Sequence, residues 1–156
     1  MSSIPPVLRL YRRFARFPGG KGLFARAVCW RAPYFGTIRP RVEALDTGRS
    51  VWSMRKRRAV HNHIGTVHAL AMGNLCEIAA GTGMEATVPR GWRWIPKGMT
   101  IEYLKKAETD ISAEATLDPA LCTRRGDVPV SVSVRNTAGE EVVRAVITMY
   151  VSEAKS

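Results

Sequence analysis

A single acidic residue stands inside a long apolar segment near the middle of the chain. Between Thr66 and Met84 the sequence is rich in alanine, leucine and glycine, and Glu77 is the one acid in it. A carboxylate in apolar surroundings is costly unless it is paired or has a function. A carboxylate at such a position can serve as a general base that takes a proton from water. Glu77 is therefore the best candidate catalytic residue.

Polar residues gather just before the same segment. Asn62 and His68 lie at the junction between a loop-like stretch, which contains Gly65, and a helix predicted over 66–84. The first turn of a helix has unpaired backbone N–H groups and the positive end of the helix dipole. The N–H of Ala69 can therefore stabilise an oxyanion. Together with Glu77, these groups predict a site for attack on a thioester carbonyl.

Several of these residues also have a purely structural interpretation. Glu77 could be a buried carboxylate that is hydrogen-bonded to a loop, and His68 could simply complete the helix start. His61 and His63 could hold a metal ion, but no third ligand is evident nearby, so no metal site is predicted. Cys76 points elsewhere around the helix than Glu77 and is predicted to be a buried, inert thiol.

The rest of the sequence predicts one antiparallel sheet around the central helix. Two short helices over 5–17 and 22–31 come first, and two strands over 38–45 and 50–56 follow. The central helix carries almost no charge and is predicted to be buried on most sides, with Gly81 and Gly83 loosening its end. The predicted later strands, rich in β-branched and aromatic residues, span 92–95, 100–109, 111–117, 128–136 and 141–152. The fold class is therefore α+β, with a sheet wrapped around one long helix.

The charge is concentrated at the N-terminal end. The net charge is +11, and nine lysines and arginines precede Glu43, the first acid. This distribution favours an anionic partner and separates a basic helical extension, residues 1–36, from a main domain, residues 37–156. The N-terminal helix could contact a membrane surface. A nucleic-acid-binding function would rest on charge alone, without a recognisable motif, so no nucleic-acid partner is predicted.

The cysteines and the hydropathy indicate the compartment. The three cysteines are widely spaced, with no CxxC motif, and they predict neither a disulfide framework nor a zinc site. No apolar run is long enough to span a bilayer. A reducing, cytoplasmic setting is expected.

The segment around the central helix resembles the hotdog-fold acyl-CoA thioesterases of the phenylacetate-pathway and 4-hydroxybenzoyl-CoA type. In that family an Asn or Gln precedes a His-Gly-Gly that enters the central helix, and an Asp or Glu follows nine residues after the His. Asn62, His68 and Glu77 occupy these positions. The two glycines are replaced by Ala69, which keeps an N–H, and by Leu70, which adds bulk where acyl-CoA would pass.

The resemblance implies a hotdog fold and hydrolysis of acyl-CoA thioesters, as in fatty acid metabolism, at the interface of a homodimer that could pair into a tetramer. Glu77 would activate water or attack the carbonyl, and the Ala69 N–H would hold the carbonyl oxygen. Asn62 would orient the carbonyl or the water, and His68 would shape the turn. CoA enters as part of the substrate, and no other cofactor is implied. The expected substrate-binding residues, with the arginines facing the CoA phosphates, are Gly65, Leu70, Asn74, Arg57, Arg58 and Arg90.

A non-catalytic protein that binds acyl groups or acyl-CoA on the same scaffold is the alternative. It is motivated by Ala69 and Leu70, which replace the two glycines of the family pattern.

Overall fold

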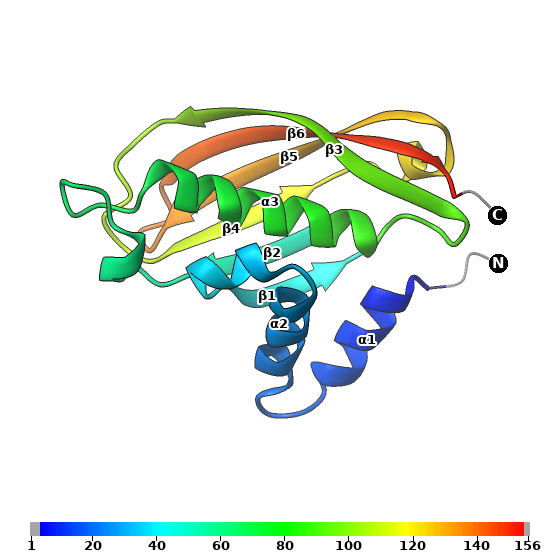
Figure 1. The fold of residues 1–156 in the computed structure, drawn as a ribbon, viewed down its shortest axis with the longest axis horizontal. Coiled ribbons are helices and arrows are strands. Elements are labelled where there is room, and N and C mark those ends of the chain that lie inside the picture. Colours follow the sequence, from blue (N-terminus) through cyan, green and yellow to red (C-terminus); the bar gives the residue numbers. More distant parts are fainter. Residues whose placement is uncertain (1–3, 155–156) are drawn as a thin grey trace.

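The computed structural model describes residues 4–154, which form one six-stranded sheet and a layer of helices (Figure 1). The α-helices are α1 (Pro6–Phe14), α2 (Gly20–Arg31) and α3 (Ala69–Glu85). Three short 3-10 helices are η1 (Pro33–Ile38), η2 (Arg58–Val60) and η3 (Pro119–Thr123). The strands are β1 (Arg41–Asp46), β2 (Arg49–Met54), β3 (Trp92–Tyr103), β4 (Ile111–Thr116), β5 (Gly126–Asn136) and β6 (Glu141–Glu153).

The sheet is antiparallel throughout, with the strand order β1-β2-β4-β5-β6-β3. Alternating side chains of β5, from Val128 to Val134, are buried, and the residues between them face outward. This alternation places one apolar face of the sheet against α3. Strands β1 and β3 form the two edges. The α+β architecture predicted from the sequence, a sheet around one long helix, is confirmed.

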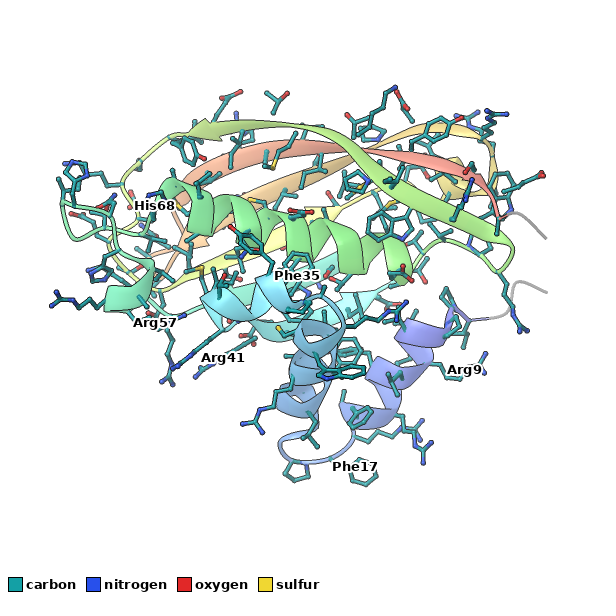
Figure 2. The ribbon with its side chains drawn as sticks, viewed as in Figure 1. Arg9, Phe17, Phe35, Arg41, Arg57 and His68 are labelled. Carbon is teal, nitrogen blue, oxygen red and sulfur yellow. The ribbon has the colours of Figure 1, made fainter. Side chains whose placement is uncertain are left out.

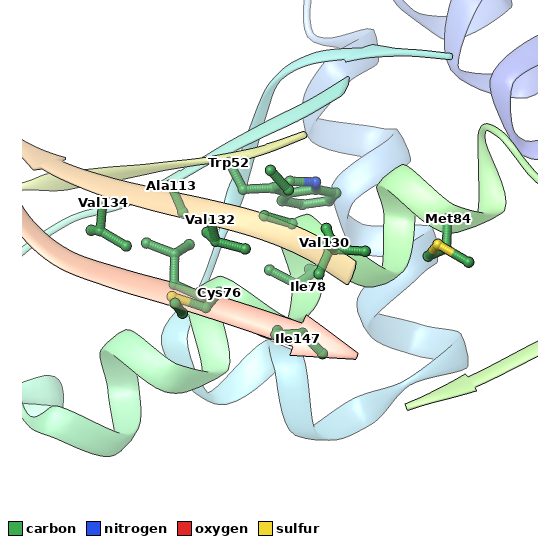
Figure 3. Packing of buried hydrophobic residues seen from close by; sticks show 14 of the residues in the cluster. Trp52, Cys76, Ile78, Met84, Ala113, Val130, Val132, Val134 and Ile147 are labelled. Atoms are coloured by element: carbon green, nitrogen blue, oxygen red, sulfur yellow. The ribbon is translucent and has the colours of Figure 1, made fainter. Parts of the chain in front are cut away.

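A buried polar network fixes α3 on the sheet. The indole N–H of Trp52 on β2 donates to the Thr82 hydroxyl at 2.8 Å, and the Ser50 and Thr82 hydroxyls lie 2.9 Å apart. All three side chains are buried, so each polar group needs a partner inside the protein. The apolar side chains around Trp52 fill the space between β2, β5 and α3 (Figure 3).

The central helix differs from the prediction at its start. It begins at Ala69 and not at Thr66, because Val67 forms an isolated β-bridge with His61 and its N–H donates to the Ala107 carbonyl. Its C-terminal end, at Glu85, lies one residue beyond the predicted end at residue 84, and Gly81 and Gly83 lie within regular helix. A Cβ on Gly81 would lie 3.2 Å from the Trp94 ring, so this glycine permits close packing of the helix against β3.

The edge strand β3 also differs from the prediction. The segment predicted over 92–95 and the first part of that predicted over 100–109 form one strand, Trp92–Tyr103, that pairs with β6 along its length. Residues 104–109 are not in a strand. The break expected at Pro96-Lys97-Gly98 is a shift in pairing register between Pro96 and Gly98. An edge strand tolerates a proline and a bulge because one side of its backbone has no partner strand.

The N-terminal helices pack beside β1, at the opposite edge of the sheet (Figure 1). Leu8 and Phe24 are almost fully buried, and the Phe24 ring lies between Tyr11, at 5.3 Å, and Trp52, at 6.5 Å between ring centroids. Apolar side chains of α1 and α2 therefore join the buried cluster that holds α3 on the sheet. The first strand begins at Arg41 and not at residue 38, because Ile38 ends η1.

Candidate active site

Glu77 lies in the middle of α3, on the side of the helix that faces the edge strand β3. Its half-buried side chain lines a cavity of about 280 Å³ together with Pro96, Gly98 and Met99 of β3 and Ile147 of β6. Met99 also comes close to the helix one turn earlier, where it lies against Gly73. Strand β3 thus supplies most of the wall that Glu77 faces, and this wall is an edge of the sheet.

The carboxylate of Glu77 has no partner within residues 4–154. It makes no hydrogen bond and no ion pair there, although Lys97 lines the same cavity. The ammonium group of Lys97 pairs with Asp127 at 2.8 Å. On the same helix, Glu85 accepts a hydrogen bond from the Trp94 indole at 3.1 Å. The half-buried carboxylate of Glu77 is therefore available to bind a ligand in the cavity.

The start of α3 presents an unpaired N–H group. His68 is the N-cap, and its Nδ1 accepts a hydrogen bond from the Leu70 N–H at 3.0 Å (Figure 2). This bond uses the imidazole to shape the turn, which agrees with the role predicted for His68. The Ala69 N–H, in contrast, has no partner among the described residues. It lies at the positive end of the helix dipole, where an oxyanion is stabilised.

Asn62 holds the loop before α3 in shape. Its Oδ1 accepts from the N–H groups of Ile64 and Thr66, and its Nδ2 donates to the Thr66 hydroxyl at 2.7 Å. Gly65 completes the turn with a φ of 79°, a conformation that glycine adopts without strain. Both lone pairs of Oδ1 and one of the two Nδ2 N–H groups of Asn62 are thus used within the loop. The predicted role of Asn62 in orienting a carbonyl stays a prediction.

A second cavity, of about 250 Å³, lies between η1, η2 and the start of α3. Asn74, only 5% exposed, lines it, and its Nδ2 makes weak hydrogen bonds to the Tyr34 carbonyl and the Thr37 hydroxyl, both 3.3 Å long. Its Oδ1 is buried without a partner in the described part of the chain. Leu70 lines the same cavity and is 70% exposed. The contribution of η1 could not be found from local sequence, because Tyr34 and Asn74 are 40 residues apart.

The three predicted arginines lie in different places. Arg57 donates to the Thr37 carbonyl at 2.6 Å and so ties η1 to the strand end (Figure 2), while Arg58 is exposed beside it. Arg90 follows the C-terminal end of α3 and lines a separate cavity with Trp92 and Glu85. The structure thus gathers the loop, the helix start and two arginines at one end of α3, and leaves Arg90 at the other end.

Within one protomer, Glu77 and the start of α3 do not meet. Eight residues separate Ala69 from Glu77, which corresponds to about 12 Å along the helix axis at ~1.5 Å per residue. A glutamate side chain does not bridge this distance and still act on the same carbonyl as the Ala69 N–H.

Residues 20–151 match the family model that is described as a domain of unknown function, DUF4442. The chain belongs to the DUF4442 family. No curated protein matches the sequence of this DUF4442 chain.

Solved structures share the fold of this DUF4442 chain. The crystal structure of a structural-genomics protein is 40% identical, with a TM-score of 0.83 over 95% of this chain and 99% of that one. A thioesterase from Haemophilus influenzae is 12% identical, with a TM-score of 0.72 over 81% and 87% of the two chains. A Streptococcus mutans protein bound to acetyl-CoA is 20% identical, with a TM-score of 0.63 over 74% and 90%. These likenesses confirm the hotdog fold.

The cysteines of the DUF4442 chain are poor nucleophiles at neutral pH. Burial raises the pKa of the Cys76 thiol to about 12, and burial with the nearby Asp118 carboxylate raises the pKa of Cys122 to about 11. Burial also raises the pKa of Cys29, but this side chain is only partly covered. At pH 8 the thiolate fraction of Cys76 is on the order of 10⁻⁴.

We expect iodoacetamide at pH 8 to label Cys29 in the folded protein and to leave Cys76 and Cys122 unmodified until a denaturant is added. Peptide mass spectrometry identifies the labelled sites. Rapid labelling of Cys76 in the folded protein would contradict the packing of α3 described above.

None of the described helices has the length and apolar character needed to cross a bilayer.

Proposed function

We propose that this DUF4442 protein hydrolyses acyl-CoA thioesters at a site formed between two copies of the chain. Glu77 of one copy takes a proton from water, and the resulting hydroxide attacks the thioester carbonyl. The Ala69 N–H of the other copy stabilises the oxyanion. When the tetrahedral intermediate collapses, the C–S bond breaks and the CoA thiolate takes the proton from Glu77. The products are a carboxylic acid and CoA.

The Glu77 carboxylate beside the edge strand, which has no partner in the described part of the chain, is the observation that carries this proposal. Glu77 lines a cavity whose other wall consists mainly of β3. Because β3 is an edge strand, a second copy that packs against β3 would lie close to this cavity. The acetyl-CoA bound by the Streptococcus mutans protein of the same fold supports an acyl-CoA ligand. The exposed Arg58 beside the helix start is suited to the CoA phosphates.

The composition of β3 supports a dimer formed through this strand. As an edge strand it has unpaired backbone groups, and Ile95, Met99 and Tyr103 on it are exposed large apolar or aromatic side chains. Soluble monomers usually protect such edges with charge or cover them with another element. The other edge, β1, has α2 packed beside it. Pairing of β3 with β3 of a second copy would satisfy the backbone and bury these side chains.

We expect the double substitution Ile95→Lys and Tyr103→Lys to convert the dimer into a monomer and to lower hydrolysis in parallel, because lysines on an edge strand oppose strand pairing. Light scattering coupled to size-exclusion chromatography measures the molecular mass. Val146→Lys is the matched control, since Val146 is an exposed apolar residue on β6, whose backbone is paired on both sides by β5 and β3. A monomeric double variant with full activity would contradict the shared site.

The activity itself is tested with a panel of acyl-CoA thioesters, with the released thiol measured by a chromogenic thiol reagent. The panel spans short, medium and long acyl chains and includes phenylacetyl-CoA and 4-hydroxybenzoyl-CoA, the substrates of the enzymes whose motif this chain resembles. We expect turnover of at least one class. If no member is hydrolysed by the dimeric protein, the proposed activity is wrong.

A non-catalytic acyl-CoA-binding function is the second candidate, and Leu70 is the observation that favours it. This side chain is 70% exposed at the start of α3, where the family pattern has glycine. A leucine there narrows the approach of a thioester to the Ala69 N–H. Acyl-CoA binding measured by calorimetry, without thiol release, would support this second function over hydrolysis.

A further inference from the structure

We propose that the two N-terminal helices form a docking surface for a membrane that contains anionic lipid. The surface, which we call the helical arm, consists of α1, α2 and the turn between them, residues 6–31. This function is independent of the hydrolysis proposed above. Three features carry it: positive charge that is mostly unpaired among the described residues, exposed apolar side chains, and an adjoining groove lined by four basic residues and Glu43.

The arm is positively charged, and few of its basic side chains pair with a carboxylate of the described residues. It contains seven basic residues and no acid, and all seven are exposed: Arg9, Arg12, Arg13, Arg16, Lys21, Arg26 and Arg31. Among the described residues, only Arg12 pairs with a carboxylate, that of Asp46 at 2.9 Å. Lys21 instead donates to the Glu43 backbone carbonyl. The arm thus presents most of its positive charge to solvent, where it attracts an anionic surface.

Large apolar side chains are exposed on the same arm. Leu23 and Trp30 are 53% and 85% exposed, and their spacing of seven residues places both on one face of α2. Phe17, at the tip of the turn between the helices, is 65% exposed (Figure 2). Each helix does have a buried side, with Leu8 of α1 and Phe24 of α2 in the core. The outer apolar residues are therefore not required for packing within the protomer.

A groove of about 770 Å³ adjoins this apolar face. It lies between α2 and the start of β1, and its basic lining residues are Lys21, Arg26, Arg39 and Arg41. Arg26 lies between Leu23 and Trp30 on the helix surface, so the apolar face and the groove are continuous. Apolar side chains with arginines beside them match the boundary between lipid acyl chains and phosphate headgroups.

The apolar residues favour a lipid surface over a nucleic acid. A nucleic acid would be bound by the same arginines, and Trp30 could stack on a base. The exposed side chains of Leu23 and Phe17 make no favourable contact with a phosphate backbone, whereas their insertion among acyl chains lowers the free energy of binding. The arm lies at the β1 side of the sheet, so a membrane bound there leaves the β3 edge accessible (Figure 1).

The test is co-sedimentation of the full-length protein with vesicles of phosphatidylcholine, with and without phosphatidylglycerol, at low and high salt. We expect binding to the phosphatidylglycerol vesicles, weakening with salt, and little binding to phosphatidylcholine alone. Arg26→Gln with Arg31→Gln should weaken binding by roughly 30-fold. The matched control, Arg124→Gln with Arg135→Gln, removes two exposed arginines outside the arm and should bind like the wild type.

A second pair of variants tests the apolar contact. Leu23→Ser with Trp30→Ser should weaken binding by at least about tenfold, whereas Val146→Ser on β6 should have no effect. Trp30→Phe should retain binding but lose the blue shift of tryptophan fluorescence that vesicles cause in the wild type. Thermal unfolding of every variant checks that the fold is retained. Failure to bind phosphatidylglycerol vesicles, binding unaffected by the arm substitutions, or binding to RNA or DNA in place of vesicles would each overturn the proposal.

Discussion

Replacing Glu77 with glutamine is expected to lower kcat for acyl-CoA hydrolysis by about 10²–10⁴-fold and to leave the Kd for a non-hydrolysable acyl-CoA analogue nearly unchanged. The glutamine has the same shape and still lines the cavity against β3, but it cannot take a proton from water. Because Glu77 has no partner within the described residues, its replacement breaks no hydrogen bond of the fold. Thiol release and isothermal calorimetry give the two quantities.

Glu85→Gln is the matched control for this substitution. Glu85 is an exposed acid on the same helix, bonded to Trp94 at the end away from the loop. It should retain wild-type kcat. If Glu77→Gln hydrolyses acyl-CoA at the wild-type rate, Glu77 is not the base, and its position beside β3 would need a structural explanation.

Ala69→Pro is expected to lower kcat by about 10²–10³-fold without unfolding the protein. Proline removes only the backbone N–H that we propose as the oxyanion donor. The first position of a helix accepts proline because that N–H has no partner within the helix. His68 already has a φ of −64° and a ψ of 139°, which is the conformation that a residue before proline prefers.

Ala69→Gly is the matched control, since glycine retains the N–H and matches the family pattern. It should keep activity close to that of the wild type, and both variants should unfold near the wild-type temperature in calorimetry. Full kcat in a folded Ala69→Pro variant would mean that another group holds the carbonyl oxygen.

The fold follows from the sequence because it depends on patterns that are local. The uncharged segment around Glu77 and the alternation in β5 suffice to predict a buried helix and a half-buried strand, and the Asn136–Gly139 turn marks the hairpin between β5 and β6. The errors occur where tertiary contacts override local signals. The apolar pattern suggests a helix start at Thr66, yet Val67 forms a β-bridge with His61 and the helix begins at Ala69. Pro96 suggests a strand end, yet at a sheet edge it produces a bulge.

The sequence predicts the positions of the candidate site residues along the chain, but not how they are arranged in space. The spacing of His68 and Glu77 indicates one end and the middle of a helix, and the structure places them there. It does not indicate that Met99 and Ile147 form the cavity wall opposite Glu77, or that η1 approaches Asn74. These contacts join residues far apart in the sequence, and no periodic pattern records them.

Subunit complementation tests the central claim, a site shared between two copies, most directly. Glu77→Gln and Ala69→Pro chains with different affinity tags are co-expressed, and the mixed dimer is isolated by two successive affinity steps. If Glu77 acts with the Ala69 N–H of the other copy, the mixed dimer contains one intact site and one doubly altered site. We predict about half of the wild-type activity for the mixed dimer and almost none for either homodimer. A mixed dimer as inactive as the homodimers would contradict the shared site.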